Sequence, residues 1–197
     1  MIRAVVAAFG LSVLSACVMV APERSMSFAG GNVLLQAPAG YCVDTVISRP
    51  ASDFAVLAPC ATLGVDTPVP DVVGFVTVKA GEAGSGIIAT DEIALRDFLI
   101  TPQGRALLST SGEAGNIRVL STQAFDDQVM VHFSDAGAPP LAGLQQEEWR
   151  AFRNVGGHLV TIGVRGLAIA PLQDGPGAGL LKQVVAGVRP SAAAPAS

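Results

Sequence analysis

Residues 148–166 read EWRAFRNVGGHLVTIGVRG, a long run of strand-forming sequence interrupted by two adjacent glycines. The pair Gly156-Gly157 could form either a hairpin turn or a β-bulge. The alternation of apolar and polar residues on both sides favours the turn. We therefore expect two antiparallel strands that meet at these glycines.

Other strand candidates lie on both sides of this hairpin, and three segments have helical patterns. Residues 90–100 and the segment opened by Thr101-Pro102 predict a pair of short helices, with Thr90 and Thr101 as N-caps. Residues 177–188 predict a last helix, because Leu181, Val184, Val185 and Val188 recur at helical spacing. The predicted fold class is α+β, a single domain with an antiparallel β-sheet and two or three helices packed on it. The other strand candidates are residues 32–38, 41–48, 53–60, 72–80, 117–125 and 128–136.

The chain begins with a basic residue and an apolar run that ends at a cysteine. Arg3 precedes the run, and the quartet Leu14-Ser15-Ala16-Cys17 closes it. The quartet resembles the lipobox of bacterial lipoproteins. That resemblance implies lipidation of Cys17, removal of residues 1–16, and sorting to the outer membrane because Val18 is not an aspartate. A signal peptide cut elsewhere and a retained membrane helix are the alternatives.

The predicted domain boundaries follow from this leader and from turn residues. Residues 17–31 contain Pro22 and the pair Gly30-Gly31, which predicts a flexible tether. The α+β domain is expected to span 32–190, and the segment 191–197 to be a disordered tail.

The charge distribution argues against a nucleic-acid partner. The formal net charge is −4, and lysines and arginines do not cluster. Binding to a polyanion requires clustered cations, so nucleic acid is excluded as the expected partner.

Cys42 and Cys60 remain if Cys17 carries lipid. An exported compartment is oxidising, so the pair predicts a disulfide between two successive strands. Two buried free thiols are the alternative. A metal site is not predicted, because neither His132 nor His158 stands at ligand spacing from a cysteine.

The order of elements resembles the PsbP-like fold, an antiparallel sheet with helices packed on it that occurs in many small exported and lipid-anchored proteins. The stretch QAPAGYC, residues 36–42, matches its opening strand and Pro-x-Gly-aromatic turn, with Tyr41 in place of the usual tryptophan. The resemblance implies an accessory or binding role more than chemistry.

The two histidines are the main candidates for chemistry. His132 alternates with Met130 and Ser134, which predicts a surface or edge position. His158 shares a face with apolar residues, which predicts a hydrogen-bonded core or strand-end histidine. Asp126-Asp127 predicts a turn between two strands, without the spacing of a calcium loop.

One aromatic group is a candidate for partner binding. Trp149 is expected to be an apolar anchor of its strand. If it were exposed beside Tyr41 or Phe152, these three residues would instead form a partner patch.

No catalytic motif and no cofactor-binding motif appears, so the sequence predicts a non-enzymatic protein without a cofactor. The expected role is a lipid-anchored module that faces the periplasm, is attached to the outer membrane, and binds an envelope protein or a small ligand. A small hydrolase-like enzyme is one alternative, which would need a histidine, a carboxylate and a hydroxyl in one cleft. A structural spacer is the other, which would have neither a sizeable pocket nor an exposed apolar patch.

Overall fold

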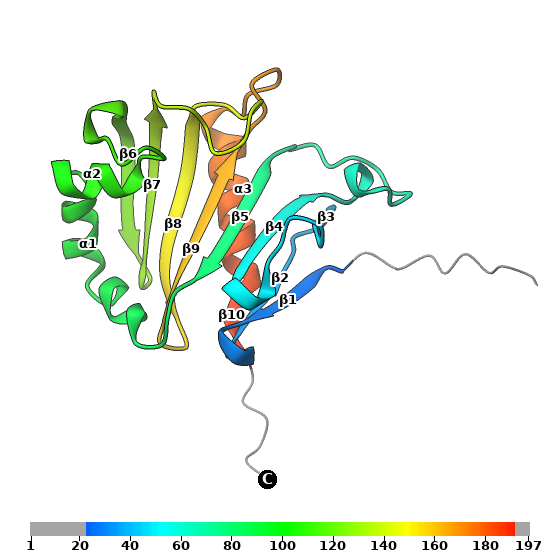
Figure 1. The fold of residues 1–197 in the computed structure, drawn as a ribbon, viewed down its shortest axis with the longest axis horizontal. Helices are drawn as coiled ribbons and strands as arrows, with labels where there is room; N and C mark the ends of the chain where they lie inside the picture. The colour runs from blue at the N-terminus through cyan, green and yellow to red at the C-terminus, as the bar shows by residue number, and fades with distance from the viewer. Residues whose placement is uncertain (1–22, 192–197) are drawn as a thin grey trace, which may run out of the picture.

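The computed structural model describes residues 23–191, which form two antiparallel sheets and three α-helices (Figure 1). The larger sheet has seven strands in the order β3-β4-β5-β9-β8-β7-β6, and the smaller has three in the order β1-β2-β10. Both sheets and all three helices belong to one domain, which confirms the predicted fold class. The strands are β1 Ser25–Phe28, β2 Val33–Gln36, β3 Tyr41–Val43, β4 Phe54–Pro59, β5 Phe75–Ala80, β6 Ile117–Phe125, β7 Gln128–Asp135, β8 Glu147–Val155, β9 His158–Arg165 and β10 Val188–Pro190.

Two-residue turns create two hairpins of the large sheet, β8-β9 near its centre and β6-β7 at its edge. Val155 of β8 pairs with His158 of β9, and Gly156 and Gly157 between them have φ angles of 59° and 84°. Positive φ at both loop residues matches the twist of the strands, which confirms the predicted split at the glycines. Asp126 and Asp127 make the equivalent turn between β6 and β7, with φ angles of 52° and 57°.

The helices are α1 Glu92–Leu99, α2 Pro102–Leu108 and α3 Asp174–Gly187. Thr101 caps α2 as predicted, because its hydroxyl accepts a hydrogen bond from the Gly104 amide at 3.1 Å. The predicted cap of α1 was wrong by one residue. Asp91 accepts the hydrogen bond from the Ala94 amide, and the Thr90 hydroxyl donates instead to the carbonyl of Ile87.

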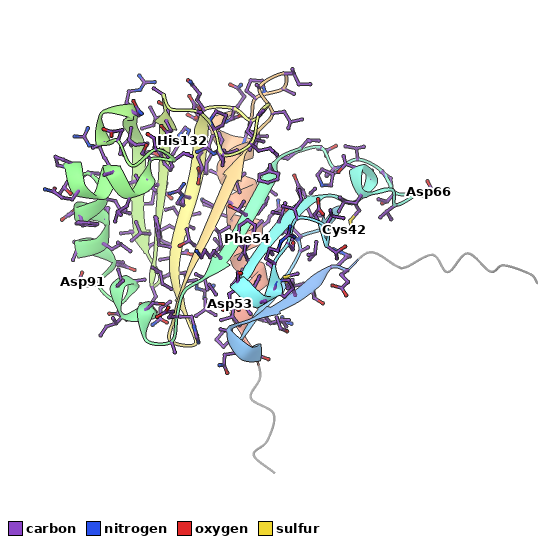
Figure 2. All side chains as sticks on the ribbon, viewed as in Figure 1. Cys42, Asp53, Phe54, Asp66, Asp91 and His132 are labelled. Carbon is purple, nitrogen blue, oxygen red and sulfur yellow. A yellow bond between two sulfur atoms is a disulfide. The ribbon has the colours of Figure 1, made fainter. Side chains whose placement is uncertain are left out.

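The helices cover opposite faces of the large sheet. In Figure 1, α1 and α2 lie beside β6 and β7, and α3 passes behind the sheet. Alternation along β7 sends side chains to both faces. Val129, Val131 and Phe133 join the helix pair in one cluster, whereas Met130 joins the core under α3. The interior filled by these side chains is visible in Figure 2.

The smaller sheet changes the predicted boundaries. Residues 25–28, assigned to the tether from sequence, form strand β1, and Phe28 is buried. The strand forms because Ser25–Phe28 pairs with Val33–Gln36 in an antiparallel register. The sequence did not predict β10, which pairs with the other edge of β2.

Cys42 and Cys60 form a disulfide with their Cα atoms 4.9 Å apart (Figure 2). Cys42 pairs with Ala58 across β3 and β4, and Cys60 follows β4 directly. The bridge therefore closes the hairpin that the sequence predicted between these strands.

Three predictions concern segments outside the described residues: the leader 1–16, the lipidated Cys17 and the tail 191–197 beyond its first residue. Within residues 23–191, no helix is both long and apolar enough to cross a membrane.

Tyr41 opens strand β3 and is 2 % exposed. Its hydroxyl donates to the carbonyl of Val72 at 2.8 Å and accepts from the Gly74 amide at 2.9 Å. Burial raises the pKa of Tyr41 above its ordinary value, and the hydrogen bond from Gly74 offsets part of that rise.

This pKa predicts how stability depends on alkaline pH. The unfolded chain loses the Tyr41 proton near pH 10, roughly, whereas the folded chain keeps it. The contribution of Tyr41 to the free energy of unfolding is therefore fully present below that pH and is lost as pH rises through the folded pKa. Because Tyr41 is the only tyrosine, tyrosinate absorbance reports this group alone, and we expect its midpoint to fall on unfolding. The unfolding free energy of Tyr41→Phe should fall less with rising pH than that of wild type. If Tyr41 titrated at its ordinary pKa in the folded protein, the raised pKa would be contradicted.

Candidate functional site

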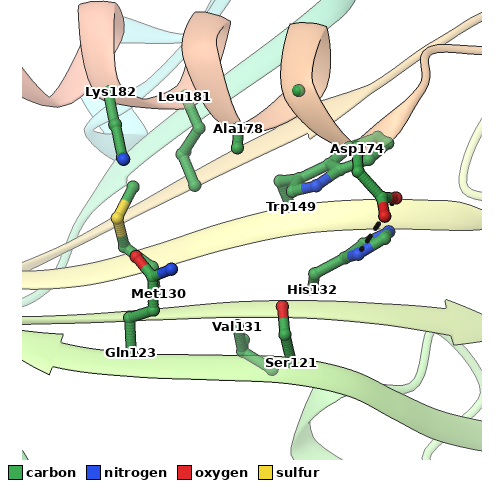
Figure 3. A pocket seen from close by; sticks show the side chains of 11 residues that line it. Ser121, Gln123, Met130, Val131, His132, Trp149, Asp174, Ala178, Leu181 and Lys182 are labelled. Carbon is green, nitrogen blue, oxygen red and sulfur yellow. Dashed lines mark ion pairs between the residues drawn. The ribbon is translucent and has the colours of Figure 1, made fainter.

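A pocket of about 280 Å³ lies between α3 and the strands β6, β7 and β8 (Figure 3). Apolar side chains supply much of its wall, and polar side chains from both the sheet and the helix point toward its mouth. This combination of an apolar interior and a few polar groups is typical of small-ligand sites. The pocket is lined by Ser121, Gln123, Met130, Val131, His132, Trp149, Asp174, Gly175, Ala178, Leu181 and Lys182.

The sheet register brings three of these side chains into one row. His132 of β7 is opposite Trp149 of β8 and opposite Ser121 of β6. The register of β6 shifts between Val119 and Ser121, which marks an irregularity in this edge strand. Such irregularities change the direction of side chains next to functional sites.

His132 and Trp149 stack face to face. Their ring centroids are 4.3 Å apart and the rings are inclined by 11°. His132 is 6 % exposed and Trp149 is 3 % exposed. The indole thus fixes the plane of the imidazole at the wall of the pocket.

Gly177 of α3 permits this arrangement. A Cβ atom at this position would lie 2.6 Å from three atoms of the Trp149 indole. Real carbon contacts require about 3.5 Å or more, so only glycine lets the helix approach the ring so closely. Trp149 is therefore held between the helix backbone and His132.

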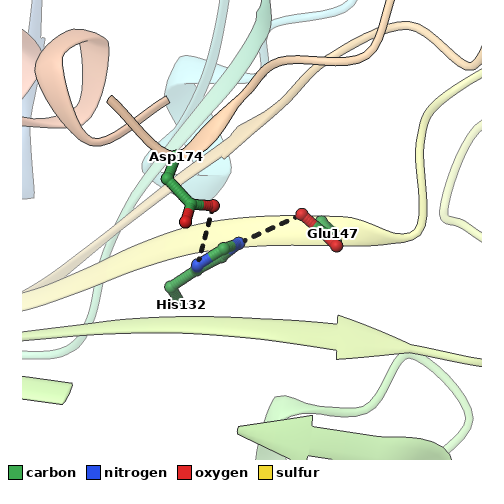
Figure 4. A group of neighbouring side chains, drawn as sticks. All are labelled: His132, Glu147 and Asp174. Atoms are coloured by element: carbon green, nitrogen blue, oxygen red, sulfur yellow. Dashed lines mark hydrogen bonds and ion pairs between the residues drawn. The ribbon is translucent and has the colours of Figure 1, made fainter. Parts of the chain in front are cut away.

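The imidazole of His132 lies between two carboxylates (Figure 4). Its Nε2 is 3.3 Å from Glu147 Oε2, and its Nδ1 is 3.7 Å from Asp174 Oδ1. The side chain of His132 is 7 % exposed, that of Glu147 40 % and that of Asp174 87 %. His132 and Asp174 line the pocket, whereas Glu147 is not among its lining residues and approaches the imidazole through the other ring nitrogen.

Asp174 is also the first residue of α3, and the cap residue Gln173 makes no side-chain hydrogen bond to the helix. A carboxylate in the first turn interacts favourably with the positive end of the helix dipole. This explains why an exposed acid is stably placed beside the pocket.

These three residues have the donor atoms of a divalent-metal site. One ligand atom from each of His132, Glu147 and Asp174 lies within 4.8 Å of the other two. Imidazole nitrogen with carboxylate oxygen suits Zn²⁺ or Mn²⁺. The sequence did not predict a metal site, because these residues are far apart along the chain and converge only through the β7-β8 register and the start of α3.

The pocket has the residue types of a hydrolase but not the arrangement. Nucleophilic catalysis needs one imidazole nitrogen on the nucleophile and the other on an orienting acid. In this pocket both nitrogens of His132 face carboxylates, and no hydrogen bond joins Ser121 to the imidazole within residues 23–191.

Two sequence predictions about this region are corrected. His132 is buried rather than at the surface, because Trp149 and α3 cover its face of the sheet. The exposed aromatic patch does not exist: Tyr41 is 2 % exposed, Trp149 is 3 % exposed, and Phe152 packs on the opposite face with the α1-α2 cluster.

His158 fits its prediction. It is the first residue of β9, is 7 % exposed, and its Nδ1 is 2.9 Å from the carbonyl oxygen of Gly81. It lies outside the pocket and has a structural role.

No protein-family model matches the chain, and no curated protein sequence matches it either. Solved structures do match. A point mutant of the protein Mog1 has a TM-score of 0.54 at 11 % identity over 86 % of this chain and 96 % of its own. The chain shares the fold of Mog1. The Ran-binding protein Mog1p of Saccharomyces cerevisiae has a TM-score of 0.51 at 12 % identity over 84 % and 94 % of the two chains.

A cyanobacterial PsbP from Synechocystis also matches, with a TM-score of 0.45 at 13 % identity over 90 % of this chain and 97 % of its own. At these identities the Mog1 structures establish the architecture of the domain and not its ligand.

The contact between Gly177 and Trp149 predicts opposite effects for two alanine substitutions in α3. Gly177→Ala should lower the unfolding free energy by about 1–3 kcal/mol, because the new Cβ atom overlaps the indole. Gly179→Ala is the matched control, since nothing lies within 4 Å of its Cβ position. It should raise stability by about 0.5–1 kcal/mol through helix propensity. Urea unfolding followed by the fluorescence of the single tryptophan measures both, and equal effects would contradict the assigned contact.

Proposed function

We propose that this chain is a lipid-anchored binding module of the bacterial cell envelope, and that the pocket under α3 is its ligand site. The observation that carries the proposal is a largely apolar pocket lined by His132 and Asp174, with Glu147 within reach of the same imidazole. The lipobox Leu14-Ser15-Ala16-Cys17 supports the anchor. The acyl chains on Cys17 would hold the domain at the outer membrane, facing the periplasm.

Binding is favoured over catalysis by the surroundings of His132. Both ring nitrogens face acids, so neither is directed to a nucleophile. The solved structure of Mog1p is described as that of a Ran-binding protein, so this fold serves binding in at least that protein. A protein partner for this chain is compatible with the same role. The spacer alternative loses support, because it required the absence of a sizeable pocket.

The charge of the pocket mouth selects the class of ligand. Two carboxylates flank the imidazole of His132. Carboxylates attract cations. Lys182 lines the wall formed by α3, but one lysine does not balance two acids.

The proposed ligand therefore carries a positive charge, as a divalent metal ion or as the ammonium group of a small molecule with an apolar body. The metal would use all three donor groups. The amine would pair with Glu147 and Asp174, while its apolar part occupied the interior beside Met130 and Leu181.

The cation site predicts saturable binding that depends on Asp174. We expect isothermal titration calorimetry to detect Zn²⁺ or Mn²⁺, or a probe amine such as butylamine, and Asp174→Asn to weaken binding at least about tenfold. Asp174 is a suitable target because its side chain is 87 % exposed, so the change should leave the fold intact. Asp127→Asn is the matched control: it removes the same charge from an exposed turn. Absence of saturable binding by every probe, or an equal loss in both variants, would contradict the cation site.

The anchor predicts a change in mass and in membrane association. Wild type expressed in a bacterial host should lose residues 1–16, gain lipid at Cys17, and fractionate with membranes. Cys17→Ser should abolish the lipid and the membrane association, because the thioether needs the cysteine sulfur. Intact-mass analysis with fractionation measures both, and a soluble mature form that is indifferent to the substitution would overturn the anchor.

A further inference from the structure

A second hollow lies on the opposite face of the large sheet from α3. Figure 1 shows that α1 and α2 lie beside β6 and β7, and the short 3-10 helix Ser85–Ala89 packs at the start of β9, so that no α-helix among residues 23–191 covers this face of β4 and β5. The hollow has a volume of about 250 Å³. Two phenylalanines, Phe54 of β4 and Phe75 of β5, supply apolar wall, and Thr77 and Thr110 supply hydroxyl groups.

Gly163, near the middle of β9, makes room for the floor of this hollow. A Cβ atom on Gly163 would lie 2.8 Å from Glu148 Oε1 and 2.9 Å from Thr77 Oγ1. Glycine is unfavourable inside a strand and often marks a place where other groups approach the backbone closely. In this strand it lets a carboxylate and a hydroxyl lie directly over the sheet.

The hollow is bordered by a buried ionic cluster, defined here as Arg150, Glu148 and Arg165. Glu148 Oε1 accepts from Arg150 Nε at 2.6 Å, and Glu148 Oε2 is 2.6 Å from Arg165 Nη2. The side chains of Glu148 and Arg165 are 6 % and 4 % exposed, and that of Arg150 is 18 % exposed.

This cluster has one more positive charge than negative charge. Asp135, another buried acid of the same face by strand alternation, accepts hydrogen bonds from the amides of Thr110 and Gly137. Lys79 of β5 lies on this face by strand alternation, but its side chain is exposed and does not line the hollow. A buried charge without a full complement of partners is costly, and an anion from solution would complete it.

Hydrogen-bond donors remain free in the same place. Among residues 23–191, neither Nη1 nor Nη2 of Arg150 makes a hydrogen bond, and Arg165 Nη2 makes none besides its ion-pair contact. Arg150 lies over the ring of Phe133 at 5.0 Å, which holds the plane of the guanidinium. A guanidinium with free, oriented Nη donors matches the two oxygens of a carboxylate.

From this geometry we propose that the hollow over Gly163 binds an organic carboxylate with an apolar or aromatic body. The carboxylate pairs with Arg150 and accepts from the Thr77 hydroxyl, and the body lies against Phe54 and Phe75. This site is on the other face of the sheet from the pocket under α3 and recognises the opposite charge. It is therefore independent of the proposed cation site.

Benzoate tests the proposal, with acetate and inorganic phosphate as comparison probes. Calorimetry should show saturable benzoate binding that is at least about tenfold tighter than acetate binding, because acetate lacks the apolar body. Amide chemical shifts of the full chain should change around Thr77 and Gly163. Absence of saturable benzoate binding up to about 10 mM would overturn the proposal. A dissociation constant above that concentration would be weaker than expected for an enclosed ion pair.

Variants then assign the binding to Arg150. Arg150→Gln should weaken benzoate binding at least about tenfold, through loss of the charge-assisted pair. Thr77→Val keeps the shape and the charges, and should weaken binding about fivefold, so the test stands even if Arg150→Gln fails to fold. Lys182→Gln is the matched control, because it removes a positive charge from the pocket under α3. Loss of binding in this control, or shift changes gathered around Trp149 and Asp174, would place the anion in the other pocket and overturn the proposal. Whether benzoate binds or not, the titration with metal ion or amine can still be interpreted, because that binding depends on Asp174 and not on Arg150.

Discussion

The contact between the Gly177 backbone and the Trp149 indole sets the position of α3 on the sheet. The absence of a side chain at Gly177 lets the helix lie directly on the ring, and the other face of the ring stacks on His132. The first turn of α3 consequently lies next to His132 of β7, which places Asp174 beside the imidazole. Without this close approach, the pocket would lose its helical wall and His132 would lose one of its two acids.

Strand alternation places the two consecutive glutamates of β8 in different ionic surroundings. Glu147 and Glu148 are consecutive in β8 and therefore point to opposite faces. Glu147 joins His132 and Asp174 on the face under α3. Glu148 lies between Arg150 and Arg165 on the opposite face, in a cluster with two guanidinium groups and one carboxylate. Strand β8 thus contributes to both proposed sites. Glu147 belongs to the cation site under α3, and Glu148 and Arg150 border the anion site over Gly163.

Much of the architecture could be predicted from local sequence. The glycine pair at 156–157, the aspartate pair at 126–127 and the Thr101-Pro102 cap each specify a turn or a helix start through their own backbone preferences. The cysteine pair predicted the bridge that closes the β3-β4 hairpin. Elements without such local signals were missed. Local sequence predicts a tether at β1 and no strand at β10, because both are strands only through pairing with β2.

The sequence by itself determined the alternating strands, the turns between them and the α+β class, since these depend on residues within a few positions of one another. It also placed His132 on the same strand face as Met130 and Ser134, although it predicted a surface or edge position where the structure buries the residue. Only the tertiary structure decided what surrounds it. Trp149, Glu147 and Asp174 come to His132 through strand register and through the docking of α3, and both are set by contacts between residues far apart in the chain. The same reason explains the ionic cluster around Glu148: its charges are visible in the sequence, but their burial over Gly163 depends on which segments pack on that face of the sheet.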